Sequence, residues 1–179
     1  MQDLRLFAPN WFCTGTNIRT NLVLMFVLFH FLSHLHQKEV LLSLSEIQSF
    51  ALVGLKTSPV MVEVHLANGF PTFTLVGLTD MEVREARERV RCAIQNAGFN
   101  FPSSQLITIH LAPDNLHKDS GRFDLPIAIG IFAASGQIDS STLKEYACAG
   151  ELSLSGDLRS VHGALAMVLG AQKAGHQHK

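Results

Sequence analysis

Residues 118–135 read Lys118-Asp-Ser-Gly-Arg-Phe-Asp-Leu-Pro-Ile-Ala-Ile-Gly-Ile-Phe-Ala-Ala-Ser135, a polar loop followed by an almost wholly apolar run. Asp124 is placed to cap the amides of a helix, Pro126 falls in the first turn, and Gly136 follows the last residue. Because such a helix is apolar on every side, other elements must surround it and hold the preceding loop in place. The loop is therefore a place to look for chemistry.

The rest of the sequence predicts strands and helices around this helix. Apolar alternation indicates strands at 47–53, 60–66, 73–76 and 106–110, with a turn at 56–59, and further strands are expected at 146–154 and 158–161. Asn68 and Gly69 form a tight-turn signal, so we expect an antiparallel hairpin or meander there. The nearly continuous β pattern at 106–110 is typical of a strand covered on both faces. We predict an α+β fold, a mixed sheet with helices mainly on one face.

A second helix is delimited by clear signals. Thr79 and Glu82 have the spacing of a capping box, and Gly98 marks the C-terminal end. A third helix is expected from Gly163 to Ala174. The apolar residues of the capped helix that share one face are Ala86, Val90, Ala93, Ile94 and Ala97.

The neighbouring face of the capped helix is basic. Arg84, Arg87 and Arg91 are three and four residues apart, so they lie on one side. Two interpretations stay open: a solvated face with internal ion pairs, or a face that contacts an anion, a nucleic acid or another subunit. The ion pairs expected on a solvated face are Arg84–Glu88 and Glu85–Arg89.

The composition indicates one globular domain. The chain has 179 residues, 47% of them hydrophobic, and a net charge of −1, so any nucleic-acid binding must come from a local patch. The three cysteines, Cys13, Cys92 and Cys148, are far apart, which favours reduced thiols in the cytoplasm. The histidines have no recognised metal-ligand spacing, so we expect no metal and no cofactor for this chain.

Residues 1–44 differ from the rest. The apolar run from Asn21 to Leu32 is too short to span a bilayer, and no small-residue cleavage site follows it. We interpret this segment as an extension that follows a misassigned start, with a membrane-surface helix as the alternative, and we expect no stable membrane insertion. The domain itself is expected at 45–175, with a tail at 176–179.

Several separated motifs in order carry a resemblance to a known family. They are Thr-Leu-Val-Gly-Leu (74–78), Glu-Ala-Arg-Glu-Arg-Val-Arg (85–91), Leu-Ala-Pro (111–113), Phe-Asp-Leu-Pro-Ile-Ala (123–128) and Gly-Glu-Leu-Ser-Leu-Ser-Gly (150–156). With them, residues 45–175 resemble the N-terminal Lon-like (ChlI-type) domain of the magnesium-chelatase-like AAA+ ATPases of the ComM/YifB family. The resemblance implies the ribosomal protein S5 domain 2-like fold, which is also that of the Lon proteolytic domain. It also implies that the chain is truncated before the ATPase module.

Two kinds of catalytic site expected from this resemblance are missing. The sequence has no Gly-x-x-x-x-Gly-Lys-Ser/Thr loop, so ATP and Mg²⁺ would belong to the missing module. A Lon-type peptidase needs a serine nucleophile and a lysine base. The resemblance places Arg122 at the serine position and Leu165 at the lysine position, and Ser120 with Lys118 or Lys173 is a remote substitute. Arg122 and Lys118 instead suit an anion or a carboxylate of another subunit, or an internal ion pair of Arg122 with Asp119 or Asp124.

Three functional hypotheses follow. The first is a noncatalytic assembly and DNA-contacting domain of a ring-forming, hexameric ATPase in DNA processing or natural transformation. The second is a residual Lon-type serine hydrolase, and the third is a non-functional fragment. The expected contacts with DNA or a neighbouring subunit are Arg84, Arg87, Arg91, Lys118 and Arg122.

Overall fold

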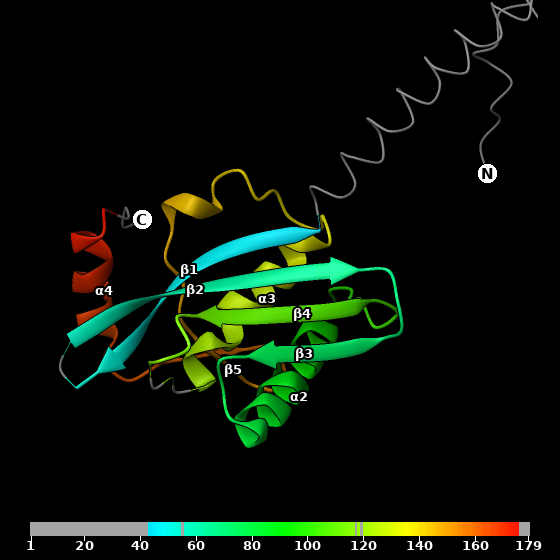
Figure 1. Ribbon diagram of the computed structural model, residues 1–179, viewed down its shortest axis with the longest axis horizontal. Coiled ribbons are helices and arrows are strands. Elements are labelled where there is room, and N and C mark those ends of the chain that lie inside the picture. Colours follow the sequence, from blue (N-terminus) through cyan, green and yellow to red (C-terminus); the bar gives the residue numbers. More distant parts are fainter. Residues whose placement is uncertain (1–42, 55, 117, 119, 176–179) are drawn as a thin grey trace, which may run out of the picture. The chain divides into compact units, whose positions relative to one another are not determined.

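The computed structural model describes residues 43–54, 56–116, 118 and 120–175 of the chain, all within the compact unit Val40–Lys179. In this part, four strands form a mixed sheet that is accompanied by three α-helices (Figure 1). The α+β prediction is confirmed. The elements are β1 (Leu44–Val53), β2 (Lys56–Ala67), β3 (Thr72–Val76), α2 (Asp80–Asn96), β4 (Leu106–Ala112), η2 (Ser120–Phe123), α3 (Asp124–Ala134), η3 (Leu143–Glu145), β5 (Glu151–Leu152), β6 (Leu158–Arg159) and α4 (Ala164–Lys173).

The order of the strands in the sheet is β1-β2-β4-β3. β1 pairs antiparallel with β2, β2 antiparallel with β4, and β3 parallel with β4. The hairpin predicted at Asn68 and Gly69 is therefore wrong. β4 lies between β2 and β3 and pairs with both of them, so β2 and β3 do not pair with each other. Parallel neighbours need a crossover connection, and α2 supplies it between β3 and β4.

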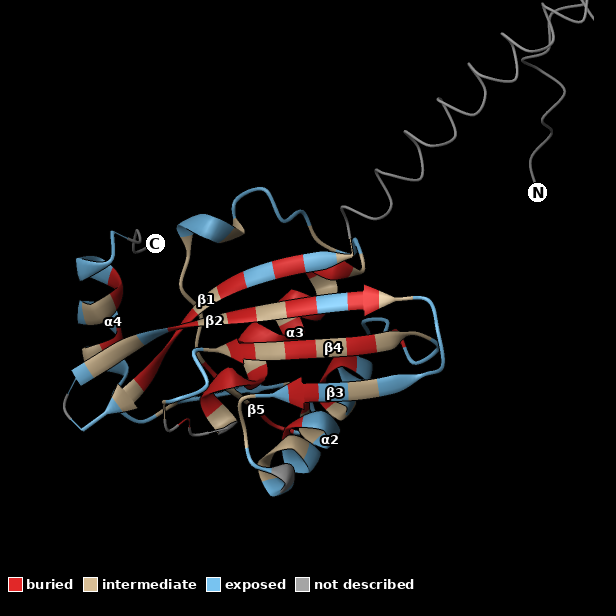
Figure 2. Cartoon of the chain, viewed as in Figure 1, coloured by how far each residue is buried: buried red, intermediate tan, exposed pale blue. Residues whose placement is uncertain are grey.

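One face of the sheet is buried along the central strands, and the other face is mostly open there. From Val60 onward in β2, and throughout β4, every second side chain is buried, including Val62, Val64 and Ile109, while the alternate ones are partly or fully exposed (Figure 2). The prediction that the strand at 106–110 is covered on both faces is thus wrong. Leu106, Thr108 and His110, on its other face, are only half-buried.

α3 lies behind the sheet, as its all-round apolar sequence predicted (Figure 1). Gly130 permits its close approach, because a Cβ there would lie 2.5 Å from Val64 Cγ2, and the buried Ser45 hydroxyl donates to the Gly130 carbonyl at 2.8 Å. The predicted N-terminal cap is corrected. Phe123 is the N-cap residue, no side chain caps the helix, and the carboxylate of Asp124 points to other partners described below.

The helices lie on both faces of the sheet. α2 and α3 cover the buried face, but α4 packs on Phe50, which forms a smaller apolar cluster with Met167 and Ala171. Phe50 alternates with Ser49 and Ala51 along β1, so α4 lies on the opposite side of the β1–β2 hairpin. The prediction that the helices lie mainly on one face is therefore confirmed for α2 and α3 but not for α4.

Two smaller predictions, of a turn and of a strand, also differ from the structure. The turn predicted at 56–59 lies earlier, because Lys56 already belongs to β2 and Pro59 pairs with Phe50, beyond the part of β2 that β4 contacts. The strand predicted at 146–154 is reduced to a bridge between Gln48 and Ala147 and to β5. Residues 1–42 of the predicted extension, with its apolar run, and the tail lie outside the described residues, whereas Leu44, the last residue of the predicted extension, already begins β1. Among the described residues no helix is long and apolar enough to cross a membrane.

Candidate nucleic-acid interface

α2 presents its arginines to solvent because its other face is held in the core. Ala86, Val90 and Ile94 are buried against the sheet and α3, whereas Arg84, Arg87 and Arg91 are exposed. The start of the helix is fixed by the predicted capping box, in which the Thr79 amide donates to Glu82 Oε2 at 3.0 Å. The three arginines therefore share an exposed face of a well-anchored helix, as the spacing predicted.

Glu88 organises two of these arginines. Arg91 Nη2 donates to Glu88 Oε2 at 2.7 Å, and Arg87 Nε donates to Glu88 Oε1 at 3.2 Å. These contacts, with the hydrogen bond from Arg91 the largest, lower the pKa of Glu88. The carboxylate is ionised at neutral pH, so the three side chains together carry a formal charge of +1. Of the two ion pairs expected on a solvated face, Glu85–Arg89 is present, with Arg89 Nη1 3.6 Å from Glu85 Oε2.

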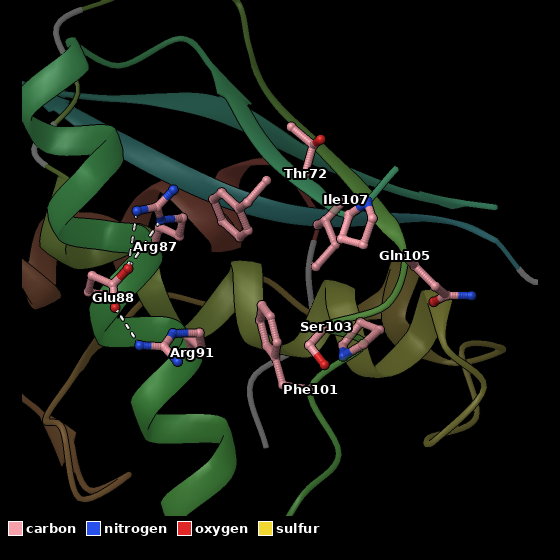
Figure 3. Close-up of a pocket in the computed structure, with 11 residues that line it drawn as sticks. Thr72, Arg87, Glu88, Arg91, Phe101, Ser103, Gln105 and Ile107 are labelled. Carbon is pink, nitrogen blue, oxygen red and sulfur yellow. Dashed lines mark hydrogen bonds and ion pairs between the residues drawn. The ribbon is translucent and has the colours of Figure 1, made fainter. Parts of the chain in front are cut away.

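Arg87 and Arg91 border an open hollow of about 250 Å³ (Figure 3). α2 forms one side of the hollow, and the start of β3, the segment 101–105 and β4 form the other. The sequence analysis missed this second side. Its residues come close to the arginines only through the β3–α2–β4 crossover, and no local sequence pattern indicates that. The lining residues are Pro71, Thr72, Phe73, Arg87, Glu88, Arg91, Phe101, Pro102, Ser103, Gln105 and Ile107.

Lys118 and Arg122 are buried and do not line this hollow. Lys118 is 2% exposed, its Nζ donates to the Pro113 carbonyl, and burial lowers its pKa. Arg122 is 4% exposed, and its Nη1 lies 3.7 Å from Met167 Sδ. Of the five cations predicted to contact DNA or a subunit, the structure therefore places only the three on α2 at the surface.

Of the two acidic residues expected as partners of Arg122, Asp124 binds Arg89, and Asp119 lies outside the described residues. Asp124 is fully buried and accepts hydrogen bonds from Arg89 Nε at 2.8 Å and Nη2 at 3.3 Å, and from the Leu152 amide at 3.3 Å. Burial raises the pKa of Asp124, and the hydrogen bond to Asp124 raises that of Arg89. This pair fixes α2 against the start of α3, which sets the orientation of the arginine face.

The two residues that the resemblance assigned to the positions of a Lon-type dyad differ in burial: Arg122 is buried, and Leu165 is 74% exposed on α4. The side chain of Ser120 and the residues Asp119, His176 and His178 lie outside what the structure describes.

A polar cluster that the sequence did not signal lies on the open face of the sheet. His110 Nδ1 lies 3.0 Å from Glu63 Oε2, and its Nε2 lies 3.2 Å from Asp114 Oδ1. The hydrogen bond to Glu63 is the main reason that the pKa of His110 is raised. The two carboxylates lie on opposite ring nitrogens and cannot share one ion with the imidazole. Within the described ranges, no group of three His, Cys, Asp or Glu side chains could hold a metal ion.

Comparison with known proteins gives consistent matches. The family model described as subunit ChlI of Mg-chelatase matches residues 62–179. The chain is 52% identical over 133 residues to the competence protein ComM of Haemophilus influenzae, covering 74% of this chain and 26% of that protein. It is 47% identical over 134 residues to the uncharacterized protein YifB of Salmonella typhimurium, covering 75% and 26%. YifB of Escherichia coli matches with 47% identity over 136 residues, covering 76% and 27%. The chain thus spans about a quarter of the length of these relatives.

Proposed function

Because the chain belongs to the ChlI family of magnesium chelatase, in its ComM/YifB group, we propose that it is a noncatalytic assembly and DNA-contacting domain of such proteins. The relative with 52% identity is named a competence protein, which supports a role in DNA processing during natural transformation. On this proposal, ATP and Mg²⁺ bind to an AAA+ ATPase region in the part of these proteins that the chain does not span. That region drives a ring, expected to be hexameric.

We assign the domain to the ribosomal protein S5 domain 2-like fold of the Lon proteolytic domain. The mixed sheet with the parallel β3–α2–β4 unit and the buried α3 supports this assignment. The absence of the dyad at Arg122 and Leu165 supports a scaffold that binds rather than cleaves.

The observation that carries the proposal is the arginine pair at the hollow. Arg87 and Arg91 extend from the rigid helix α2, their side chains are each 44% exposed, and both reach the same hollow. Guanidinium groups donate several hydrogen bonds in a fixed plane and suit phosphate oxygens. A local basic patch of this kind is what a chain with a net charge of −1 needs to bind DNA.

Charge reversal tests this role. The double variant Arg87→Glu/Arg91→Glu should weaken binding of the chain to labelled DNA and reduce the slope of log affinity against log salt by about 2. The control variant Lys144→Glu/Lys173→Glu makes the same change of charge at exposed positions away from the hollow and should keep the slope.

Other results would contradict the proposal. Equal effects of the two variants would mean that net charge, not the hollow, controls binding. Binding that is absent from the start would refute DNA contact. Size-exclusion chromatography of the same samples shows whether the arginines serve a contact between subunits instead.

A further inference from the structure

Two aromatic rings complete the hollow beside the arginines. Phe73 of β3 and Phe101 of the segment before β4 are half-buried, and both pack against the main core cluster. Both also line the hollow, and Phe101 lies across it from the helix that carries Arg87 and Arg91 (Figure 3). Packing against the core therefore restrains both rings.

We propose that this hollow is a subsite for one unpaired base and the adjoining phosphate of a single-stranded nucleic acid. The inference rests on the proposed function, since both use Arg87 and Arg91, but it adds a specific ligand and the residues that select it. Phe101 and Phe73 supply the surface for the base. The arginines supply the phosphate contact.

The size and composition of the hollow favour an unpaired base. Its volume of about 250 Å³ lies below the range of roughly 300–1,000 Å³ that is usual for ligand pockets, so it suits a single planar group. In a duplex the base faces are covered by their neighbours, whereas a single strand can place them on aromatic side chains. Thr72, Ser103 and Gln105 line the same space and offer donors and acceptors to a base edge.

The arginines are arranged to hold a phosphate at the rim. Each binds Glu88 through part of its guanidinium group and is 44% exposed, so N–H groups remain on the solvent side. Glu88 restrains both guanidinium groups, and the three side chains together leave a net charge of +1 at the rim. A base in the hollow would have its own backbone within reach of that charge, because the arginines border the cavity itself.

The test measures binding of the full chain to labelled oligonucleotides by fluorescence anisotropy. The probes are oligo-dT and oligo-rU of roughly 15 nucleotides and a duplex of the same length. Phe101→Leu should weaken binding of the single strands by about tenfold, as expected for loss of one stacked base, and leave duplex binding unchanged. Phe101→Tyr keeps the ring and should keep the affinity. If dT and rU bind equally, the subsite does not read the sugar.

Phe99→Leu is the matched control. Phe99 is 48% exposed and its ring packs on Phe132, with centroids 4.6 Å apart, but it does not line the hollow. Thermal denaturation monitors folding of each variant. If Phe101→Leu does not fold, Phe73→Leu is used in its place, and the same weakening of single-strand binding is expected.

The possible failures are separable. If binding depends on Arg87 and Arg91 but not on the rings, or if duplex and single strand weaken together in Phe101→Leu, the base subsite is refuted and the proposed function stands. If no nucleic acid binds, both are refuted. If poly-glutamate competes with the oligonucleotides and responds to Phe101→Leu in the same way, the hollow is a site for an acidic protein segment, and the base subsite is again refuted.

Discussion

The buried pair of Arg89 and Asp124 should be a main determinant of the stability of the domain. Asp124→Ala would remove the acceptor of two hydrogen bonds from Arg89 and of one from the Leu152 amide, in a place where the carboxylate is fully buried. The guanidinium group of Arg89 would remain beside the core without its partner. The same change would free the start of α3 from α2.

The expected magnitude follows from the geometry. Loss of one partner of a buried ion pair destabilises a protein by about 3–5 kcal/mol. The Arg89 side chain is 22% exposed, so water can reach it, and we expect the lower end, about 3 kcal/mol. For a domain of this size that corresponds to a fall in Tm of about 10 °C. Asp124→Asn keeps an oxygen for the Leu152 amide and should lose only about 1–2 kcal/mol.

Urea unfolding followed by circular dichroism measures these values. A double-mutant cycle with Arg89→Met and Asp124→Leu tests whether the two residues act as a pair. The double variant should lose less stability than the sum of the single variants, because it leaves no buried charge without a partner. Additive losses, or an Asp124→Ala variant as stable as the wild type, would refute the role assigned to this pair.

Two further predictions concern the sheet. Because the pKa of His110 is raised in the folded chain, mainly by its hydrogen bond to Glu63, its contribution to stability is complete below the ordinary histidine value and is lost as pH rises through the folded-state value. His110→Gln should therefore flatten the dependence of the urea midpoint on pH just above 6.5; parallel profiles for His110→Gln and the wild type would contradict this. Gly130→Ala should destabilise the domain by about 1–3 kcal/mol despite the better helix propensity of alanine, because the added methyl group would meet Val64 Cγ2 at 2.5 Å. Gly69→Ala, whose nearest contact would be Leu106 Cβ at 3.9 Å, is the control, and equal midpoints for the two would contradict the packing argument.

Local signals predicted the helices well. The capping box at Thr79 and Glu82 and the glycine after α2 are local in sequence, and the structure confirms both. The all-round apolar character of 125–134 correctly predicted a buried α3. Asp124 was misinterpreted because an aspartate at a helix start usually caps it. A buried carboxylate gains more from the Arg89 guanidinium, and the sequence separation of 35 residues hid that partner.

Strand order could not be predicted in the same way. Two strands joined through Asn68 and Gly69 satisfy every local rule for a hairpin, and no local feature shows that β4 lies between them. The buried alternation of Ile107, Ile109 and Leu111 shows that β4 needs a covered face, but it does not identify the neighbours. Which strands pair depends on how all apolar faces are covered together, and that is a property of the whole chain.

The position of β4 between β2 and β3 also explains why only half of the candidate site could be predicted. The arginines were visible as a spacing within one helix, whereas Thr72, Phe73 and the segment 101–105 precede or follow that helix. They meet the arginines only because β3 and β4 pair in parallel across α2. In the predicted hairpin, β3 would have paired with β2, away from the strand that follows 101–105, and no hollow would have formed there. The crossover that buries the apolar face of α2 thus also places its basic face beside two aromatic rings. The binding role proposed for the domain therefore depends on its strand order as much as on its arginines.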